Sequence, residues 1–365
     1  MTIRNIIEVL ETLAPPALQE SYDNAGLLTG KPDWPCTGIL CTLDATEAVV
    51  AEAISKKCNL IVAHHPIIFG GLKKINGKNY VERTVIAAIK QDIAIYAIHT
   101  NLDNVAWGVN GKMADLLGLV NRQPLLPKEG TLKKLYTFVP LARAEAVKEA
   151  IFQAGGGHIG QYSECSFGTE GTGTFKGGPG TNPFVGEPGA RHAERELRIE
   201  VVLPAWLQHR VVAALLRAHP YEEVAYDLVN LSNPHPATGA GLLGELPEPL
   251  APETFLGFLK ERFGLPLVRH TALTDRPVKK VALCGGAGSF LISRALAVGA
   301  DFFITGDMKY HEFFDADGRL VIADIGHYES EQYTTGLLYD ILQEKFPTFA
   351  VLKSGVQTNP VYYYF

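Results

Sequence analysis

Five side chains able to ligate a metal follow short apolar runs in this 365-residue sequence. His64 and His65 lie near the end of NLIVAHHP, and Asp103 closes IAIYAIHTNLD. His327 and Glu331, in IGHYESEQ, have a spacing that puts both on one face of a helix. Imidazole and carboxylate ligands without thiolates suit zinc, iron, manganese or nickel, and are too rich in nitrogen for calcium. Five ligands are too many for one open tetrahedral site. They predict two divalent metals about 3.5 to 4 Å apart, a pair that can generate a hydroxide and clamp a substrate oxygen.

Each of these residues also has an ordinary structural explanation. One histidine of the pair could cap or border a core, and Asp103 alone fits a turn or helix cap better than a ligand. Most His-x-x-x-Glu pairs are surface pairs. The joint placement at strand ends favours the metal site. His99 precedes Asp103 by four residues, so on one strand both face the same side; it could be a ligand, a ligand's partner or a substrate contact. Glu329 points away from the His327 face and is predicted to be a solvated charge.

The segments around these ligands alternate between strand and helix patterns. Apolar runs predict strands and 3.6-residue periodicity predicts helices. The alternation predicts an α/β layer with a mainly parallel sheet, in which sites form beyond the carboxyl ends of strands. In the first part of the chain, strands are predicted at 38–46, 59–66 and 93–103, and helices at 3–13, 46–57 and 81–91. In the last part, strands are predicted at 278–288, 301–307 and 319–327, and helices at 290–300 and 328–345.

The middle of the chain has a different character. Residues 121–134 are rich in turn formers and predict a linker. The patterns that follow are strand, helix, a glycine-rich hairpin with a loop, helix and strand, the order of a ferredoxin-like unit. We therefore predict an α/β fold: a three-layer domain whose mainly parallel sheet is formed by both chain ends, 1–125 and 236–365. A ferredoxin-like α+β domain, 126–235, is inserted in it.

The composition excludes several classes of protein. Hydrophobic residues make up 47% and charged residues 20%, which predicts a folded globular chain rather than a disordered one. The net charge of −6, without a basic block, argues against nucleic acid or an anionic membrane as partner. No stretch is long and apolar enough to span a bilayer, and MTIRNIIEVLETLAPP is not a signal peptide. The five scattered cysteines contain no CxxC pair, which predicts reduced thiols and a cytoplasmic protein.

Two further segments could carry chemistry. GGAGS, at 285–289, lies between a predicted strand and helix, as a nucleotide-binding turn would. It lacks the full G-x-G-x-x-G and the Walker lysine, so a tight turn is favoured over a phosphate site. The segment 306–318 contains Asp307, Lys309 and His311, which could be rim or interface groups, or simply part of a polar loop.

Six segments together resemble one known family, the Nif-three-like proteins, also called GTP cyclohydrolase I type 2 homologues. The resemblance covers roughly residues 1–125 and 235–365, and the motifs occur in the family's order. The middle resembles the ferredoxin-like insert of longer bacterial members, which is similar to the trimer-forming CutA and PII domains. The motifs are SYDNAGLL (21–28), TLDAT (42–46), IVAHHPIIF (61–69), IHTNLDN (98–104), ITGDMKYHEFFDA (304–316) and IGHYESE (325–331).

The resemblance implies roles for the five ligands. His65 and Asp103 would hold one ion, His64 and His327 the other, and Glu331 would bridge them. The resemblance thus implies two divalent ions as cofactors, and from the ligand types we expect zinc ahead of iron, manganese or nickel. The implied assembly is a toroidal homohexamer, a trimer of dimers, with the metal sites facing its cavity and the inserts capping its openings. One departure is an aromatic residue at position 22, which is tyrosine here where members often have tryptophan.

The family name implies a reaction, the hydrolytic opening of the GTP imidazole ring with release of formate. Its general base would be His99 or Glu331. We therefore expect a metal-dependent hydrolase acting on a nucleotide or another cyclic amide. The alternative is a non-catalytic ring that holds metal, senses a small molecule or scaffolds a partner. A further alternative is that the insert serves only for oligomerisation.

Overall fold

The computed structural model describes residues 1–364, and the chain divides into two compact units. One, the two-segment unit, consists of Met1–Pro127 and Ala237–Phe365; the other, the inserted unit, consists of Lys128–Pro236. None of the described helices is long and apolar enough to cross a membrane. All five cysteines are free thiols.

The first sheet of the two-segment unit is formed by both ends of the chain and is mainly parallel, as predicted. The sheet order is β1-β4-β3-β2-β15, and only β1 runs antiparallel to its neighbour. Its strands are continuous apolar runs because helices cover the sheet, as the packing of α2 and α3 side chains against it shows. The strands are β1 Gly26–Thr29, β2 Ile39–Asp44, β3 Leu60–His65, β4 Ala94–Ala97 and β15 Val351–Lys353, and the first helices are α1 Ile3–Leu13, α2 Glu47–Ser55 and α3 Tyr80–Lys90.

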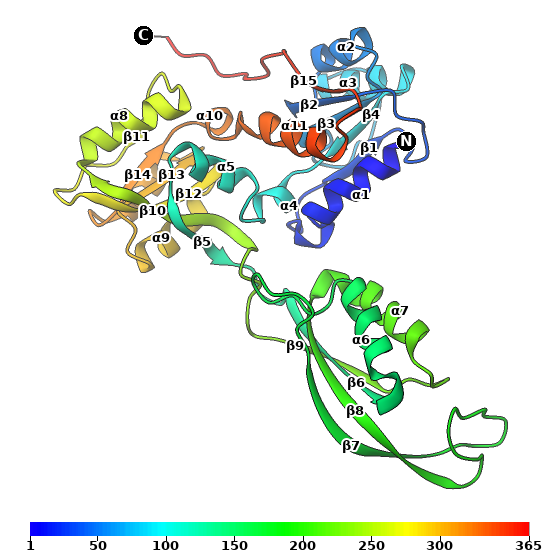
Figure 1. The fold of residues 1–365 in the computed structure, drawn as a ribbon. Helices are drawn as coiled ribbons and strands as arrows, with labels where there is room; N and C mark the ends of the chain where they lie inside the picture. Colours follow the sequence, from blue (N-terminus) through cyan, green and yellow to red (C-terminus); the bar gives the residue numbers. More distant parts are fainter. Residues whose placement is uncertain (365) are drawn as a thin grey trace. The chain divides into compact units, whose positions relative to one another are not determined.

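A second sheet, with mixed strand directions, completes this unit, where the sequence patterns had predicted one sheet. Its order is β11-β14-β13-β12-β10-β5, with parallel pairing only among β12, β13 and β14. Helices α5 and α8 pack on one face and α9 on the other. Figure 1 shows α5, α10 and α11 between the two sheets. The strands are β5 Val120–Pro127, β10 Gly239–Leu250, β11 Arg269–His270, β12 Val278–Ala287, β13 Phe302–Gly306 and β14 Val321–Asp324, and the helices are α5 Val109–Leu116, α8 Pro252–Phe263, α9 Ile292–Ala297, α10 His327–Glu331 and α11 Thr334–Lys345.

The predicted linker at 121–134 is wrong, because much of it is the edge strand β5. This strand pairs antiparallel with β10, so that Pro124 lies opposite Leu242 and Pro127 opposite Gly239. An edge strand tolerates proline because only one side of it takes part in the ladder. The turn-forming composition was visible in the sequence, but the distant partner strand was not.

The predicted strand 93–103 is also too long. It ends at Ala97, and a short helix, α4 (Thr100–Asp103), follows. Side chains stop the strand: the Asn101 amide oxygen accepts a hydrogen bond from the His99 N–H, and its nitrogen donates to the carbonyl of Ala14. Residues 99 and 103 therefore do not share a strand face as expected.

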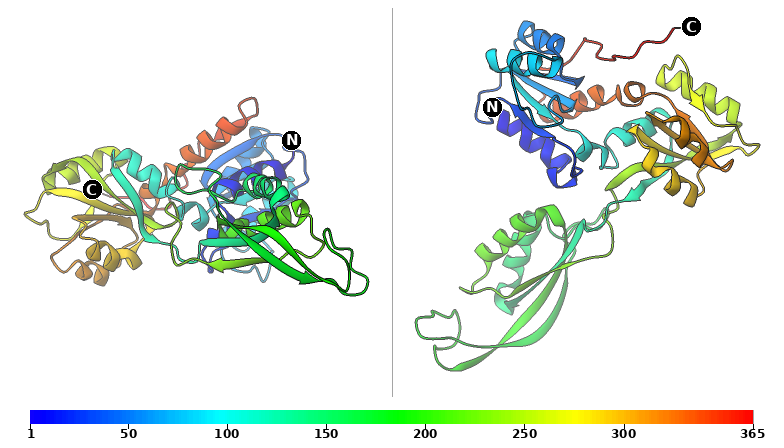
Figure 2. Two further views of the ribbon diagram at one scale, coloured as in Figure 1. Left: turned by 60° about the horizontal axis from the view of Figure 1, so that its bottom comes forward. Right: turned by 180° about the vertical axis from the view of Figure 1, so that it is seen from behind.

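The inserted unit has the predicted ferredoxin-like order. Its strands pair antiparallel in the order β7-β8-β6-β9, which places the first and third strands side by side in the centre. Both helices pack on one face of this sheet, where they bury its core (Figure 2). The elements are β6 Leu132–Pro140, α6 Ala144–Gln153, β7 Phe167–Lys176, β8 Arg191–Pro204, α7 Gln208–Ala218 and β9 Tyr226–Asn230.

Candidate metal centre

The five predicted ligands meet within the two-segment unit. His64 and His65 are the last residues of β3, and Asp103 is the last residue of α4. His327 and Glu331 are the two ends of α10, which follows β14 after a turn at glycine. The end of strand β3, the short helix α4 and helix α10 thus bring together residues more than two hundred positions apart in the sequence.

Glu331 lies at the centre of the cluster, with one carboxylate oxygen facing each of two donor pairs. Its Oε2 is 2.8 Å from His65 Nε2 and 3.1 Å from His327 Nε2. Its Oε1 is 3.9 Å from His64 Nε2, and that nitrogen is 3.6 Å from Asp103 Oδ1. In each set of three residues, one ligand atom per residue lies within 4.8 Å of the others.

This geometry groups the ligands differently from the pairing that the family resemblance implied. His65 groups with His327, and His64 groups with Asp103; Glu331 is shared between the two groups. The two imidazoles lie side by side at the end of β3, with ring centroids 4.9 Å apart, but they reach different partners. His64 turns toward the segment after β4, whereas His65 turns toward β2 and α10.

Each ligand imidazole is oriented by a hydrogen bond at its other ring nitrogen. The Nδ1 atom of His64 is 2.8 Å from the carbonyl oxygen of Ile98. The corresponding atoms of His65 and His327 are each 2.7 Å from a carboxylate oxygen, of Asp44 and Asp307 respectively. An oxygen partner at Nδ1 fixes the tautomer and leaves Nε2 free to bind, which is the usual arrangement around metal-ligating histidines.

Two carboxylates that orient histidines were not predicted from the sequence. Asp44, in TLDAT, contacts His65, and Asp23, in SYDNAGLL, contacts His99, but nothing in the spacing linked either aspartate to its histidine. Asp307 had been singled out only as a possible rim or interface group. A signal did exist, because aspartates at the carboxyl end of a strand or in a neighbouring loop lie where sheet sites form.

Two atoms of the cluster are buried without any hydrogen-bond partner. They are His64 Nε2 and Asp103 Oδ1, although 26% of the Asp103 side chain is exposed. A buried polar atom left unsatisfied costs about 1–3 kcal/mol, so such atoms call for an explanation. A cation between the two atoms would satisfy both. The donor set of imidazole nitrogen and carboxylate oxygen therefore fits divalent metals.

The charges of the cluster are strongly coupled. Burial opposes ionisation of Glu331, but hydrogen bonds from His327 and His65 hold the pKa of its carboxyl well below the usual value. Burial, together with the nearby charge of Glu331, raises the pKa of Asp103 well above its usual value. Complete burial lowers the pKa of His64 to about 3, so this imidazole is neutral, as a ligand must be.

The other two ligand histidines are protonated when no metal is bound. Burial disfavours their charged forms, but the Asp44 and Glu331 carboxylates raise the pKa of His65 to about 10. The pKa of His327, likewise opposed by burial and raised by Glu331 and Asp307, reaches about 9. Both protons lie where the site otherwise places a cation, so metal binding must release them.

His99 lies beside the cluster and forms with His64 and His65 a third set of possible ligands, which does not include the glutamate. Its ring centroid is 5.3 Å from that of His64 and 5.5 Å from that of His65. Its Nδ1 is 2.8 Å from Asp23 Oδ1. Burial opposes ionisation of Asp23, but hydrogen bonds from His99 and Thr100 lower the pKa of this aspartate to about 2.

The prediction for Glu329 is wrong. Only 7% of this residue is exposed, and it is not a solvated charge. Its Oε1 accepts hydrogen bonds from the Asn359 side chain, at 3.1 Å, and from the Tyr363 hydroxyl, at 3.2 Å. The reason is the segment after β15, which returns over α10 and covers a side chain that the helix alone would leave in solvent.

The glycine-rich segment GGAGS packs against the site. Gly286 has a φ of +61°, and its N–H donates to the Ser330 hydroxyl at 3.0 Å. A Cβ at this position would lie 2.5 Å from Glu331 Oε1. Glycine at position 286 therefore lets α10 approach β12 closely enough to place the shared carboxylate.

A cavity of about 500 Å³ reaches the cluster at His65 and His327. Arg269 is the only lysine or arginine among the described residues that line it, and its Nη1 is 3.0 Å from Asp324 Oδ2. The cavity also contains the carboxylates of Asp44, Asp307, Asp324 and Glu329. Its walls are therefore predominantly acidic.

Nearly the whole chain matches one family model. The family model of Duf34/NIF3 (NGG1p interacting factor 3) matches residues 1–360. The chain belongs to this family. A protein of Halalkalibacterium halodurans named GTP cyclohydrolase 1 type 2 homolog is 41% identical over 363 residues, which are 98% of this chain and 97% of that one. A Bacillus subtilis protein of the same name is 38% identical over 362 residues, with the same coverage of each chain.

Solved structures agree with this membership. The chain is similar to a Bacillus cereus protein related to NIF3, with a TM-score of 0.87, 38% identity and coverage of 100% of this chain and 99% of that one. HcgD from Methanocaldococcus jannaschii, at 18% identity and a TM-score of 0.58, shares the fold. The resemblance noted from the sequence motifs is thus confirmed for this member of the Duf34/NIF3 family.

Proposed function

We propose that this Duf34/NIF3 protein is a hydrolase that uses two divalent metals to open a cyclic amide. The observation that supports this proposal is the position of Glu331, whose two carboxylate oxygens face separate pairs of possible ligands. In one of these pairs, His64 Nε2 and Asp103 Oδ1 are buried without a hydrogen-bond partner. Five ligands arranged around a shared carboxylate suit two ions better than one. The adjoining cavity of about 500 Å³ is within the range of small-molecule sites.

His65 and His327 would hold one ion and His64 and Asp103 the other, with Glu331 between them. When bound, such a pair of ions supplies a Lewis acid that activates water and polarises a carbonyl oxygen. Zinc is our first expectation, with iron, manganese and nickel as alternatives. The protein's part is to hold the imidazoles in their binding tautomers, through Asp44, Asp307 and the Ile98 carbonyl.

His99 is our candidate for the general base. Asp23 is ionised and accepts the Nδ1 proton of this histidine, which leaves Nε2 as the nitrogen able to take a proton. His99 Nε2 hydrogen-bonds to none of the residues that the structure describes. Glu331, the other predicted base, has both oxygens directed at ligand nitrogens, and we assign it to metal binding.

The charge of the cavity does not by itself select one class of substrate. Its charged side chains are mainly acidic, and Arg269 is paired with Asp324, but the two divalent ions would add positive charge beside His65 and His327. Nucleotides and neutral cyclic amides therefore both belong in the panel of substrates.

Metal analysis combined with turnover tests the proposal. Purified protein should carry two metal ions per chain by elemental analysis, and the loaded form should hydrolyse members of a panel of cyclic amides and purine nucleotides, with formate followed for GTP. Glu331→Gln should lose metal and turnover. The matched control Glu344→Gln, at a side chain that is 76% exposed, should lose neither.

Two results would contradict the proposal. One is a stoichiometry of a single ion in the wild type; the other is full turnover by Glu331→Gln. Two bound ions without turnover of any compound would instead identify the second candidate, a metal-holding binding protein. That candidate is favoured by the ligand set, which already offers each ion three protein residues.

A further inference from the structure

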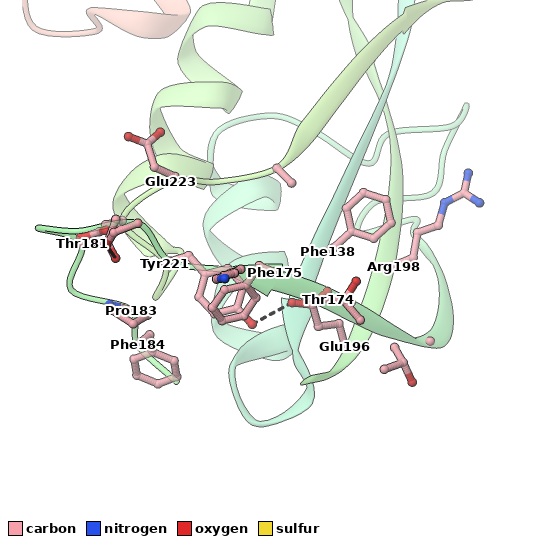
Figure 3. Close-up of a pocket in the computed structure, with 18 of the residues that line it drawn as sticks. Phe138, Thr174, Phe175, Thr181, Pro183, Phe184, Glu196, Arg198, Tyr221 and Glu223 are labelled. Atoms are coloured by element: carbon pink, nitrogen blue, oxygen red, sulfur yellow. Dashed lines mark hydrogen bonds between the residues drawn. The ribbon is translucent and has the colours of Figure 1, made fainter. Parts of the chain in front are cut away.

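The inserted unit contains a cavity of its own, of about 650 Å³. It lies among the β7–β8 hairpin, the loop after β7 and the turn after α7 (Figure 3). Its walls are mainly apolar, and the close-up shows the rings of Phe175 and Tyr221 lying beside each other. Phe138, Phe184 and Pro183 complete these walls.

Glycines in β7 make room for this cavity. In the strand FGTEGTGTFK, Gly171 lies opposite Glu196 of β8. A Cβ on Gly171 would meet nothing within 4 Å, and one on Gly173 would overlap Glu196 Oε2. Neither glycine has a positive φ. These glycines are therefore explained by the space they leave beside the glutamate, not by backbone conformation.

Glu196 is a buried carboxylate that lines the cavity without a cationic partner. Only 7% of the residue is exposed. Its Oε1 accepts a hydrogen bond from the Tyr221 hydroxyl at 2.7 Å, drawn as the dashed line in Figure 3. Burial and this carboxylate raise the pKa of Tyr221, so the phenol stays protonated and donates. No lysine, arginine or histidine of the described residues forms an ion pair with Glu196, and buried charges normally have one.

The remaining charges around the cavity leave it acidic. Among the lining residues, Arg198 is paired with Glu200, at 3.3 Å, and lies over the Tyr136 ring at 4.7 Å. Lys176 is the other basic residue. The carboxylates in the lining are those of Glu170, Glu196, Glu222 and Glu223, and of these Glu170 is paired with Arg195.

We propose that this cavity binds a small organic cation, a primary or quaternary ammonium on an apolar body. Glu196 is its counter-ion, and the rings of Phe138, Phe175 and Tyr221 enclose the apolar part. Aromatic rings attract ammonium groups through their faces, and a desolvated carboxylate adds the specific charge contact. One ring of the wall already attracts a cation of the protein, since the Arg143 guanidinium lies 5.9 Å from the Phe184 centroid.

The proposal excludes anionic ligands from this cavity. A phosphate or carboxylate placed near Glu196 would meet like charge, which opposes its binding. The site is separate from the candidate metal centre, because every residue that lines it belongs to the inserted unit.

Binding of three matched probes to the full-length protein tests this inference. The probes are phenethylamine, its neutral isostere 2-phenylethanol and the anion 3-phenylpropionate, each titrated by calorimetry and by saturation-transfer NMR. The amine should bind about tenfold or more tightly than the alcohol, and the anion should not bind. Glu196→Gln, which keeps an acceptor for Tyr221, should remove the preference for the amine and leave the alcohol unchanged.

Two further variants distinguish the effect of the Glu196 charge from the effect of the cavity volume. Gly171→Leu fills the cavity and should weaken the amine and the alcohol alike. Glu145→Gln, the same change at a side chain of the inserted unit that is 87% exposed and lies outside the cavity, should leave all three probes unaffected. Equal binding of amine and alcohol, an unchanged preference in Glu196→Gln, or no binding of the amine by the folded wild type would each overturn the proposal.

Discussion

Replacing Gly286 with alanine should weaken metal binding while leaving the protein folded. The backbone there has a φ of +61°, which costs an alanine about 1–2 kcal/mol because its Cβ approaches the following carbonyl oxygen. The new Cβ would also lie 2.5 Å from Glu331 Oε1. Ordinary van der Waals contact begins near 3.4 Å, so the carboxylate must move by about 0.9 Å.

A shift of that size matters because metal–ligand distances tolerate only about ±0.2 Å. Oε1 of the shared carboxylate would leave the donor set of His64 and Asp103, and metal affinity should fall about 10- to 100-fold or more, as it does when ligand-supporting contacts are lost. The control is Gly264→Ala, since Gly264 has a φ of +64° and no atom lies within 4 Å of the position that its new Cβ would take. Gly264→Ala therefore introduces the same backbone strain, but its new Cβ contacts no other atom.

The assay is calorimetric titration of chelator-treated protein with zinc, together with urea denaturation without metal. Both variants should lose about 1–2 kcal/mol of unfolding free energy from the backbone strain. Only Gly286→Ala should lose metal affinity. Wild-type zinc affinity in Gly286→Ala, or equal losses in the two variants, would refute the reasoning.

Four other predictions concern the orienting contacts, protonation, the core and the assembly. Asp44→Asn should weaken zinc binding about 10- to 100-fold by calorimetry, because His65 loses the carboxylate that orients it, whereas the exposed Asp340→Asn should have no effect. With chelator present, the melting temperature should fall as the pH rises from 6.5 to about 10. The reason is that folding raises the pKa of His327 to about 9 and that of His65 to about 10, so their protonation stabilises the folded state fully only below pH 6.5. A melting temperature that does not change over this range would contradict the reasoning. Phe302→Ala should cost about 3–5 kcal/mol in urea denaturation, because the ring is fully buried in the second sheet, and a loss below about 1 kcal/mol would be inconsistent with that burial. Native mass spectrometry of the full chain should show a homohexamer, the assembly that the resemblance implies, and a monomer would contradict it.

The sequence predicted the local elements of the fold well where the pattern was strong. The apolar run before His65 became β3, and the periodic segment at the start of the chain became α1. Both successes rest on short-range physics, because burial periodicity is written into neighbouring residues. The linker prediction failed because the local composition favours turns, whereas the segment is a strand, β5, that pairs with β10, which is distant in the sequence.

In the candidate site, too, the sequence predicted some residues, and others became apparent only in the structure. Residue type and spacing sufficed to select His64, His65, Asp103, His327 and Glu331, because divalent metals favour few kinds of side chain. The structure brings all five together. Nothing in the spacing could reveal the carboxylates that orient the imidazoles, which come from other strands and loops.

The sequence by itself determined the ligand chemistry, the α/β class and the ferredoxin-like order of the insert. Only the tertiary structure decided which ligands lie together, that Glu329 is buried, and that Gly286 makes room for Glu331. The physical reason is that ligand type is a property of single residues, whereas pairing depends on which way each side chain leaves its strand or helix. At the end of β3, a difference of one residue sends one imidazole toward Asp103 and the next toward His327.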